Sequence, residues 1–212
     1  MADLLARTQL NRGERNTLVR ADAFRCFDSH RYQSQWQVSA VEEYRPLLAS
    51  AEPLDDGIEL AAPSEVDDIR WDYSYSGLTL RRHPLALLRD KPSFRRCVRA
   101  SDLSTMKAGS LLHIAGLVTC RQRPGSAGGV LFITLEDETG YANIIVWKNR
   151  QQAFRQAIIS GRLLLIRGAL QRSDKLPQLN AEQQTPVIHV VASVIEDLTA
   201  AMPLDTHSHD FH

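Results

Sequence analysis

The feature that most constrains this chain is a change of hydrophobic period near residue 109, where helical spacing gives way to alternation. Residues 130–137 alternate strictly, with Leu131, Ile133 and Leu135 on one face and Phe132, Thr134 and Glu136 on the other. Glu138–Gly140 is typical of a hairpin turn, in which Gly140 supplies backbone angles that other residues avoid. Residues 141–148 then form the returning strand, so a β domain is predicted here.

Three further strands are predicted around this hairpin, at residues 111–120, 162–172 and 187–195. Residues 149–160 have helical spacing, and Gly161 stops that helix. Three strands, a helix and two strands is the order of a five-stranded oligonucleotide-binding (OB) barrel, whose helix lies between strands three and four. We therefore predict an α+β chain with an OB-fold domain over residues 105–198. Another small α+β domain with the same order of elements stays open.

The first part of the chain has helical spacing instead. Helices are predicted at residues 3–10, 14–27 and 29–43, with a break before the second in which Gly13 takes a positive φ. We assign residues 1–43 to a helical, helix-hairpin-helix-like region. Such a hairpin can present backbone N–H groups to a DNA phosphate, and an ordinary pair of packing helices is the alternative.

Between these regions the composition changes twice. Residues 44–70 are acidic and rich in proline, which is typical of an extended linker. Residues 71–104 are predicted to be a connecting segment with short helices, one starting at Pro84 and another near 91–100. Residues 199–212 form a C-terminal tail.

The net charge of zero conceals a reversal along the chain. Residues 42–72 hold ten acids and two bases, whereas residues 77–123 hold ten bases and two acids. The two segments can pair with each other, or the basic one can bind a polyanion. A further hypothesis is that the acidic segment masks the basic one until DNA displaces it.

Several classes of protein are excluded by composition. The longest apolar runs are far shorter than the roughly 20 residues that span a bilayer, so no membrane is expected. The N-terminus carries Asp3 and Arg7 where a secretion signal needs an apolar core. The three cysteines form no CxxC pair, which argues against a zinc knuckle or a disulfide framework and favours a reducing cytoplasm.

No catalytic or metal-binding constellation stands out. The pairs Asp55–Asp56 and Asp67–Asp68 are adjacent residues whose side chains diverge, so we interpret them as solvated acids. His207, His209 and His212 have a spacing that can hold Zn²⁺, but without a fixed scaffold we expect only adventitious affinity. We predict no catalytic residue, no metal ligand and no cofactor in this segment.

Four stretches, taken in order, resemble one known family. Residues 118–159, VTCRQRPGSAGGVLFITLEDETGYANIIVWKNRQQAFRQAII, resemble the OB domain near the C-terminus of bacterial C-family DNA polymerases. Residues 71–89, WDYSYSGLTLRRHPLALLR, resemble the segment that precedes it, and residues 4–38 look like the helix-hairpin-helix region. The final SHDFH is similar to the terminus of the error-prone branch.

The resemblance implies translesion synthesis and damage-induced mutagenesis as the setting. In that family, catalysis belongs to a palm domain whose acidic residues hold two Mg²⁺ ions, and this sequence contains no such motif. The chain is therefore expected not to polymerise alone. The partners that the family implies are single-stranded or primer–template DNA, accessory mutagenesis proteins and the sliding clamp.

The candidate binding residues follow from strand alternation. Phe132 is predicted to point outward and stack on a base, although it can instead pack under the loop at 121–129. On the next strand, Asn143 can contact a base edge or backbone, and Trp147 can stack or pack. The candidates for phosphate contact, each of which can equally be an ordinary surface base, are Arg121, Arg123, Lys148, Arg150, Arg162, Arg167 and Arg172.

Three functions fit this pattern. The first is a DNA-binding segment of an error-prone polymerase, which holds single-stranded template or primer–template in the OB groove. The second is a module that recruits mutagenesis or clamp partners and binds little DNA itself. The third, an anticodon-binding domain of a tRNA synthetase, is disfavoured by the flanking segments. Salt dependence separates the first from the second, because phosphate contacts weaken steeply as salt rises.

Overall fold

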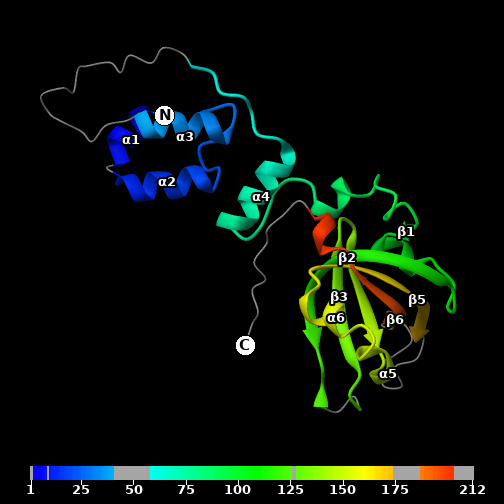
Figure 1. The fold of residues 1–212 in the computed structure, drawn as a ribbon. Coiled ribbons are helices and arrows are strands. Elements are labelled where there is room, and N and C mark those ends of the chain that lie inside the picture. Colours follow the sequence, from blue (N-terminus) through cyan, green and yellow to red (C-terminus); the bar gives the residue numbers. More distant parts are fainter. Residues whose placement is uncertain (1, 9, 41–57, 126–127, 174–186, 203–212) are drawn as a thin grey trace, which may run out of the picture. The chain divides into compact units, whose positions relative to one another are not determined.

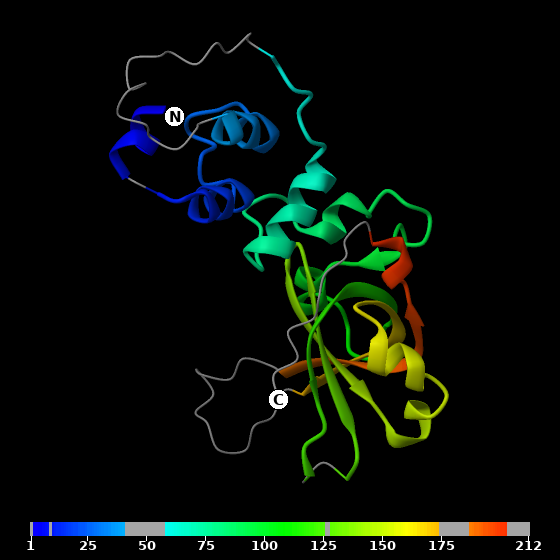
Figure 2. The ribbon, with the colours of Figure 1, turned by 60° about the vertical axis from the view of Figure 1, so that its left-hand side comes forward.

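The computed structural model describes residues 2–8, 10–40, 58–125, 128–173 and 187–202. These residues fall into two compact units: a helical unit that ends at Arg81 and a barrel unit that begins at Arg82. Figure 1 shows the elements of each unit, and Figure 2 shows them from a second direction. Among the helices described, none is long and apolar enough to cross a membrane.

The barrel unit is built on a closed, mixed sheet (Figure 1). Its long strands are β2 (Leu111–Gln122), β3 (Leu131–Asp137), β4 (Gly140–Val146), β5 (Leu163–Ser173) and β6 (Val187–Asp197). The first half of β2 pairs antiparallel with β5 and its second half with β3, whereas β4 and β6 pair in parallel. This closure confirms the predicted OB fold.

Alternation along the strands produces the barrel core. The inward residues of β3, among them Ile133 and Leu135, are fully buried, as are Ile144 on β4 and Ile166 on β5. They belong to one continuous apolar cluster that draws on every long strand. Each fully buried side chain of this kind contributes roughly 1.5–3 kcal/mol, so the core dominates the stability of this unit.

The predicted helix lies between β4 and β5, as expected, but it is interrupted. It consists of α5 (Lys148–Gln151) and α6 (Arg155–Ser160), and Ile158 of α6 joins the core. Gly161 ends α6, and its N–H donates to the carbonyl oxygen of Ala157 at 3.0 Å. A Cβ atom at Gly161 would lie 2.5 Å from that oxygen, so only glycine fits this stop.

Short elements flank the barrel. The 3₁₀ helix η2 (Pro84–Leu87), strand β1 (Cys97–Val98) and the 3₁₀ helix η3 (Ala100–Ser104) precede β2, and η6 (Thr199–Ala201) follows β6. The helix predicted near 91–100 is wrong: this stretch forms turns and then β1, which pairs in parallel with β2. Leu103 of η3 is buried in the barrel core, so the segment before β2 is part of the barrel unit.

Asp137 fixes this preceding segment to the β3–β4 hairpin. Its buried carboxylate accepts hydrogen bonds from the Thr139 N–H at 2.7 Å, the Ala100 N–H at 2.8 Å and Arg89 Nη2 at 3.0 Å. Arg89 Nε also donates to Glu138 at 2.8 Å. Burial raises the pKa of Asp137, but the hydrogen bonds and the charge of Arg89 outweigh it, so the pKa lies below its usual value.

The helical unit contains α1 (Ala2–Thr8), α2 (Arg12–Arg20), α3 (Arg31–Ala40) and α4 (Glu65–Tyr75). Its N-terminal helices were predicted, but the turn was misplaced. Gly13 lies inside α2, which Asn11 caps by accepting from the Glu14 N–H at 3.0 Å. The left-handed residue of the turn after α2 is Asp22, with φ of 58°. The predicted helix over 14–27 therefore ends at Arg20.

Helix α4 occupies residues that the composition assigned to linker and connecting segment. Ser64 caps it, because the Ser64 hydroxyl oxygen accepts from the Asp67 N–H at 3.2 Å. Residues 44–57 of the predicted linker lie outside the described residues, whereas residues 58–64 are described and lead into α4 without regular secondary structure. Part of the acidic segment is thus helical and packed, with Ile69 fully buried.

A buried charge network holds α4 against the turn after α2 and the start of α3. Arg31, only 1% exposed, pairs with Asp72 and lies 3.7 Å from Asp68 and 3.8 Å from Asp22. Arg81 pairs with the same three carboxylates, at 2.6–3.0 Å.

The network also bears on the charge reversal along the chain. Arg81 comes from the basic segment and Asp68 and Asp72 from the acidic one, so here the two segments do pair. Burial raises the pKa of Asp72, but hydrogen bonds from Thr79, Arg31 and Arg81 outweigh it and leave that pKa low. These pairs do not mask a DNA-binding base, because Arg81 is a structural partner inside the helical unit.

Candidate nucleic-acid interface

An apolar row crosses the outer surface of the barrel, perpendicular to the strands. Phe132 on β3 pairs with Ile145 on β4, and Ile145 pairs with Val191 on β6. Val191 pairs with Ala169 on β5, which in turn pairs with Leu111 at the start of β2. We call these five residues the apolar row. It is one unbroken register across five strands, so apolar side chains lie next to one another on the surface.

Alternation with the core shows that the row faces outward. Phe132 lies between Leu131 and Ile133, which are both buried, and Val191 lies between Val190 and Ala192, which are both buried. The row residues are themselves partly exposed, and Leu111 is 85% exposed. The predicted outward direction of Phe132 therefore agrees with its position in β3.

An open groove of about 330 Å³ extends the row on one side. Three row residues, Leu111, Ala169 and Val191, line it together with Trp147 and Arg150. Trp147 directly follows β4 and is 50% exposed, so its indole is accessible instead of packed in the core. The groove thus combines apolar walls, an aromatic face and a cation.

Asn143 lies on the same outer face, one outward position from Ile145. It is exposed, and its cross-strand neighbour is Thr134, whose hydroxyl lies 3.4 Å from Asn143 Oδ1. Polar groups therefore flank the row on the β3–β4 side, where they can bond to a base edge or a sugar.

Three of the predicted bases, Arg123, Lys148 and Arg150, lie on or beside α5, and a residue that the sequence did not single out joins Arg123 to this helix. Gln151 accepts from Arg123 Nη2 at 2.8 Å and donates to the carbonyl oxygens of Gly129 at 2.8 Å and Val146 at 3.0 Å. It ties the loop after β2 to α5, where Lys148 and Arg150 are exposed. No local motif marks Gln151, because its three partners come from separate parts of the chain.

The other predicted bases lie elsewhere on the barrel. Arg121 points toward the α6–β5 junction and donates to the Gly161 carbonyl oxygen, and Arg162 directly precedes β5 at that same junction. Arg167 forms an ion pair with Glu196, and Arg172 Nη1 donates to the Ser104 carbonyl oxygen at 3.1 Å. These contacts give Arg121, Arg167 and Arg172 structural partners that the sequence could not indicate.

Titratable groups add little charge at the row. His189 lies on β6, two residues before Val191, and burial lowers its pKa, so it is neutral near pH 7. Among the described residues, no group of three or more His, Cys, Asp or Glu side chains is placed to hold a metal ion. His207, His209 and His212 lie outside the described residues. The expectation of no cofactor stays a prediction.

Comparison with known proteins identifies the barrel. Residues 112–187 match the family described as "OB-fold nucleic acid binding domain". Among solved structures, asparaginyl-tRNA synthetase from Pyrococcus horikoshii is 21% identical, with 48% of this chain and 23% of that one covered and a TM-score of 0.38. A TM-score this low carries no argument about function.

Sequence relatives cover the helical unit as well. Error-prone DNA polymerase from Idiomarina loihiensis is 42% identical over 199 residues, which are 93% of this chain and 18% of the relative. Its counterpart from Saccharophagus degradans is 39% identical over 212 residues, which are 100% of this chain and 20% of the relative. The chain spans about a fifth of the length of these relatives. It is thus homologous, along nearly its whole length, to one segment of the bacterial error-prone DNA polymerases, and that segment contains an OB-fold nucleic acid binding domain.

Proposed function

We propose that the barrel unit binds single-stranded DNA across the apolar row, as the DNA-holding part of an error-prone DNA polymerase. The observation that carries this proposal is the continuous series of cross-strand pairs that joins Phe132 to Leu111 on the outer surface. The matched family description and the printed names of the relatives support nucleic acid, and specifically DNA, as the ligand.

The chemistry of the row suits unpaired bases. Stacking of a base on an aromatic side chain is worth about 1–3 kcal/mol, and Phe132 and Trp147 offer aromatic faces that are not fully buried. Exposed cations at Arg123, Lys148 and Arg150 can contact the phosphates of a strand that lies along the row. A duplex offers no base faces, so we assign the row to a single strand.

Recruitment of a protein is the competing function. An exposed apolar row with Leu111 at 85% exposure also suits a partner protein, such as an accessory mutagenesis protein or the sliding clamp. These partners stay predictions, as does a cytoplasmic location. Polymerisation is a property of the whole relatives, and we propose that this chain contributes DNA binding to it.

Fluorescence anisotropy of a labelled oligothymidine, at low and moderate salt, tests the proposal. Phe132→Ala should raise the Kd about 5- to 150-fold, which corresponds to the stacking energy. The matched control is Phe27→Ala, which removes an exposed Phe from the helical unit, where the side chain is 50% exposed. It should leave the Kd unchanged.

The same assay decides between the alternatives. Binding to the wild type that weakens steeply with salt supports phosphate contact. No binding even at low salt would overturn the proposal in favour of protein recruitment. A clear preference for an oligouridine RNA of equal length would instead favour the anticodon-binding alternative.

A further inference from the structure

The segment that leads into β1 folds as a chain of tight turns. Backbone N–H groups of Leu88, Lys91, Phe94 and Cys97 each donate to the carbonyl oxygen three residues earlier, all at 2.9 Å. The turns therefore repeat every three residues from Leu85 to Cys97.

The segment carries both buried anchors and exposed bases. Leu85, Leu88 and Phe94 are at most 2% exposed, whereas Lys91, between Leu88 and Phe94 in the series of turns, is exposed. Arg95 and Arg96 follow Phe94 directly and are exposed. Arg89 adds a second attachment, because it pairs with Asp137 and Glu138 at 3.0 and 2.8 Å. The exposed bases are consequently held on a fixed backbone.

We call Lys91, Arg95, Arg96 and Arg99 the basic turn. All four are exposed. Arg96 makes no hydrogen bond or ion pair with any residue that the structure describes, and Arg95 bonds only the carbonyl oxygen of Asp90, through Nε at 3.2 Å. Among the described residues, the Lys91 ammonium makes one hydrogen bond, to the Ala201 carbonyl oxygen at 3.5 Å, and Arg99 Nε lies 3.5 Å from a Glu138 carboxylate oxygen. Their charges are largely uncompensated.

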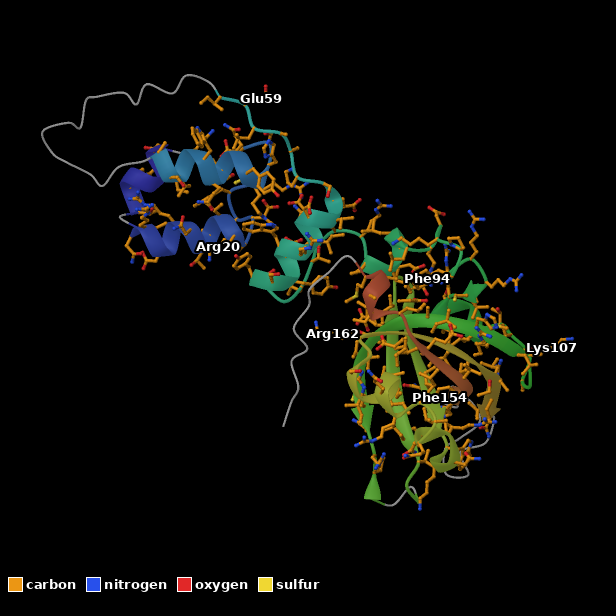
Figure 3. The ribbon with its side chains drawn as sticks, viewed as in Figure 1. Arg20, Glu59, Phe94, Lys107, Phe154 and Arg162 are labelled. Atoms are coloured by element: carbon orange, nitrogen blue, oxygen red, sulfur yellow. The ribbon has the colours of Figure 1, made fainter. Side chains whose placement is uncertain are left out.

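The basic turn lies near one end of the apolar row. Strand β1 pairs with β2 at His113 and Ile114, just beyond the row residue Leu111. β5 pairs with the same part of β2, so β1 lies along the opposite edge of β2. A strand that leaves the row at Leu111 therefore approaches the segment that carries the basic turn. Figure 3 labels Phe94 of this segment, and Lys107, a further exposed base that precedes β2.

We propose that the basic turn binds the phosphate backbone of duplex DNA next to the single strand on the apolar row, so that the barrel unit recognises a junction between single and double strands. This inference rests on the proposed function. The basic turn carries no exposed aromatic side chain, since Phe94 is 1% exposed, so it can contact phosphates but cannot stack bases. A duplex suits it because paired bases need no stacking partner and the helix carries a charge about every 1.7 Å of axis.

Anisotropy with three DNA probes tests this: a blunt duplex, a single strand, and a duplex with a single-stranded tail. We expect the wild-type chain to bind the tailed duplex more tightly than either simple probe. Arg95→Ala combined with Arg96→Ala should weaken binding to both duplex probes and reduce the salt slope, log Kd against log salt, by about 1.8. Binding of the single strand should stay within about twofold.

Arg155→Ala is the control for the double variant, because Arg155 is, like Arg96, an exposed arginine of the same unit without a partner among the described residues. It should leave the salt slope unchanged. An unchanged slope in the double variant on the blunt duplex would overturn the basic turn as a duplex site. An equal loss on all three probes would overturn its preference for duplex.

Failure of this inference can be distinguished from failure of the proposed function. Phe132→Ala should weaken the single strand and the tailed duplex but spare the blunt duplex. If the single strand does not bind at all, the proposed function fails, and the junction fails with it. If the single strand binds through Phe132 and the double variant has no effect, only the basic turn fails.

Discussion

The helical unit and the barrel unit are stabilised by opposite kinds of interaction. The barrel contains a continuous apolar cluster to which every long strand contributes. In the helical unit, Val19, Phe24 and Val38 form a small buried cluster, and Arg31 is buried among carboxylates. We therefore expect the barrel unit to be most sensitive to lost packing volume and the helical unit to be most sensitive to the loss of a buried charge. Variants that separate the two follow, from the largest expected effect to the smallest.

Arg31→Ala should have the largest effect. It leaves Asp22, Asp68 and Asp72 close together with Arg81 as their main partner, and removal of one member of a buried ion pair costs about 3–5 kcal/mol. Hydrogen exchange followed by mass spectrometry should show lost protection in peptides of the helical unit while barrel peptides keep theirs.

Arg25→Ala is the control for this charge effect. Arg25 is 64% exposed and lies 4.0 Å from Asp22, so its loss should change stability by less than about 0.5 kcal/mol. Equal losses of stability in Arg25→Ala and Arg31→Ala would contradict the expectation that buried charge stabilises the helical unit. Lost protection in barrel peptides of Arg31→Ala would contradict the separation of the units.

Ile144→Ala should have the opposite effect: it should reduce hydrogen-exchange protection in the barrel unit and not in the helical unit. Ile144 is fully buried in the barrel core, and such truncations cost about 2–5 kcal/mol because they leave a cavity. Exchange should increase in barrel peptides, whereas Ile159→Ala, at a side chain that is 63% exposed on α6, should have little effect. A similar result from both truncations would show that the barrel core does not depend on packing.

Asp137 gives the barrel unit its own charge dependence, of smaller size. Because its pKa is lowered by folding, it contributes stability above its usual value of 3.8 and loses it as the pH falls through the folded value. Asp137→Asn should cost about 1.5–3 kcal/mol at neutral pH and flatten the pH dependence below about 4. Urea unfolding at several pH values, followed through barrel amide signals, measures the stability cost and its pH dependence. If Asp137→Asn leaves the loss of stability at low pH unchanged, Asp137 does not contribute to that loss.

The local features of the barrel could be predicted from sequence because they repeat at short range. The alternation around Phe132 gave the correct outward face, and Gly140 takes a φ of 145° in the hairpin as expected. A signal for α4 was also present: Ser64 and Asp67 have the spacing of a helix cap. The prolines and acids around this cap are typical of a linker and obscure the helix signal.

Features that join distant segments could not be predicted in this way. The apolar row needs the registers of β6 and β5 with β4 and β2, and no periodicity fixes register between separated strands. The burial of Arg31 depends on Asp22, Asp68 and Asp72 meeting in space. A long arginine in an amphipathic helix otherwise predicts a solvated side chain. The candidate site was therefore predicted at Phe132, Asn143 and Trp147, but not at Leu111, Ala169 or Val191.

The parallel contact between β4 and β6 has a consequence for synthesis of the chain on the ribosome. Phe132 and Ile145 leave the ribosome early and can form their hairpin, but Val191, which joins them to Ala169 and Leu111, leaves it last. A nascent chain that stops before β6 holds most of the row yet cannot assemble it. Affinity for a single strand should therefore appear abruptly, only once the final strand has been translated and the barrel has closed.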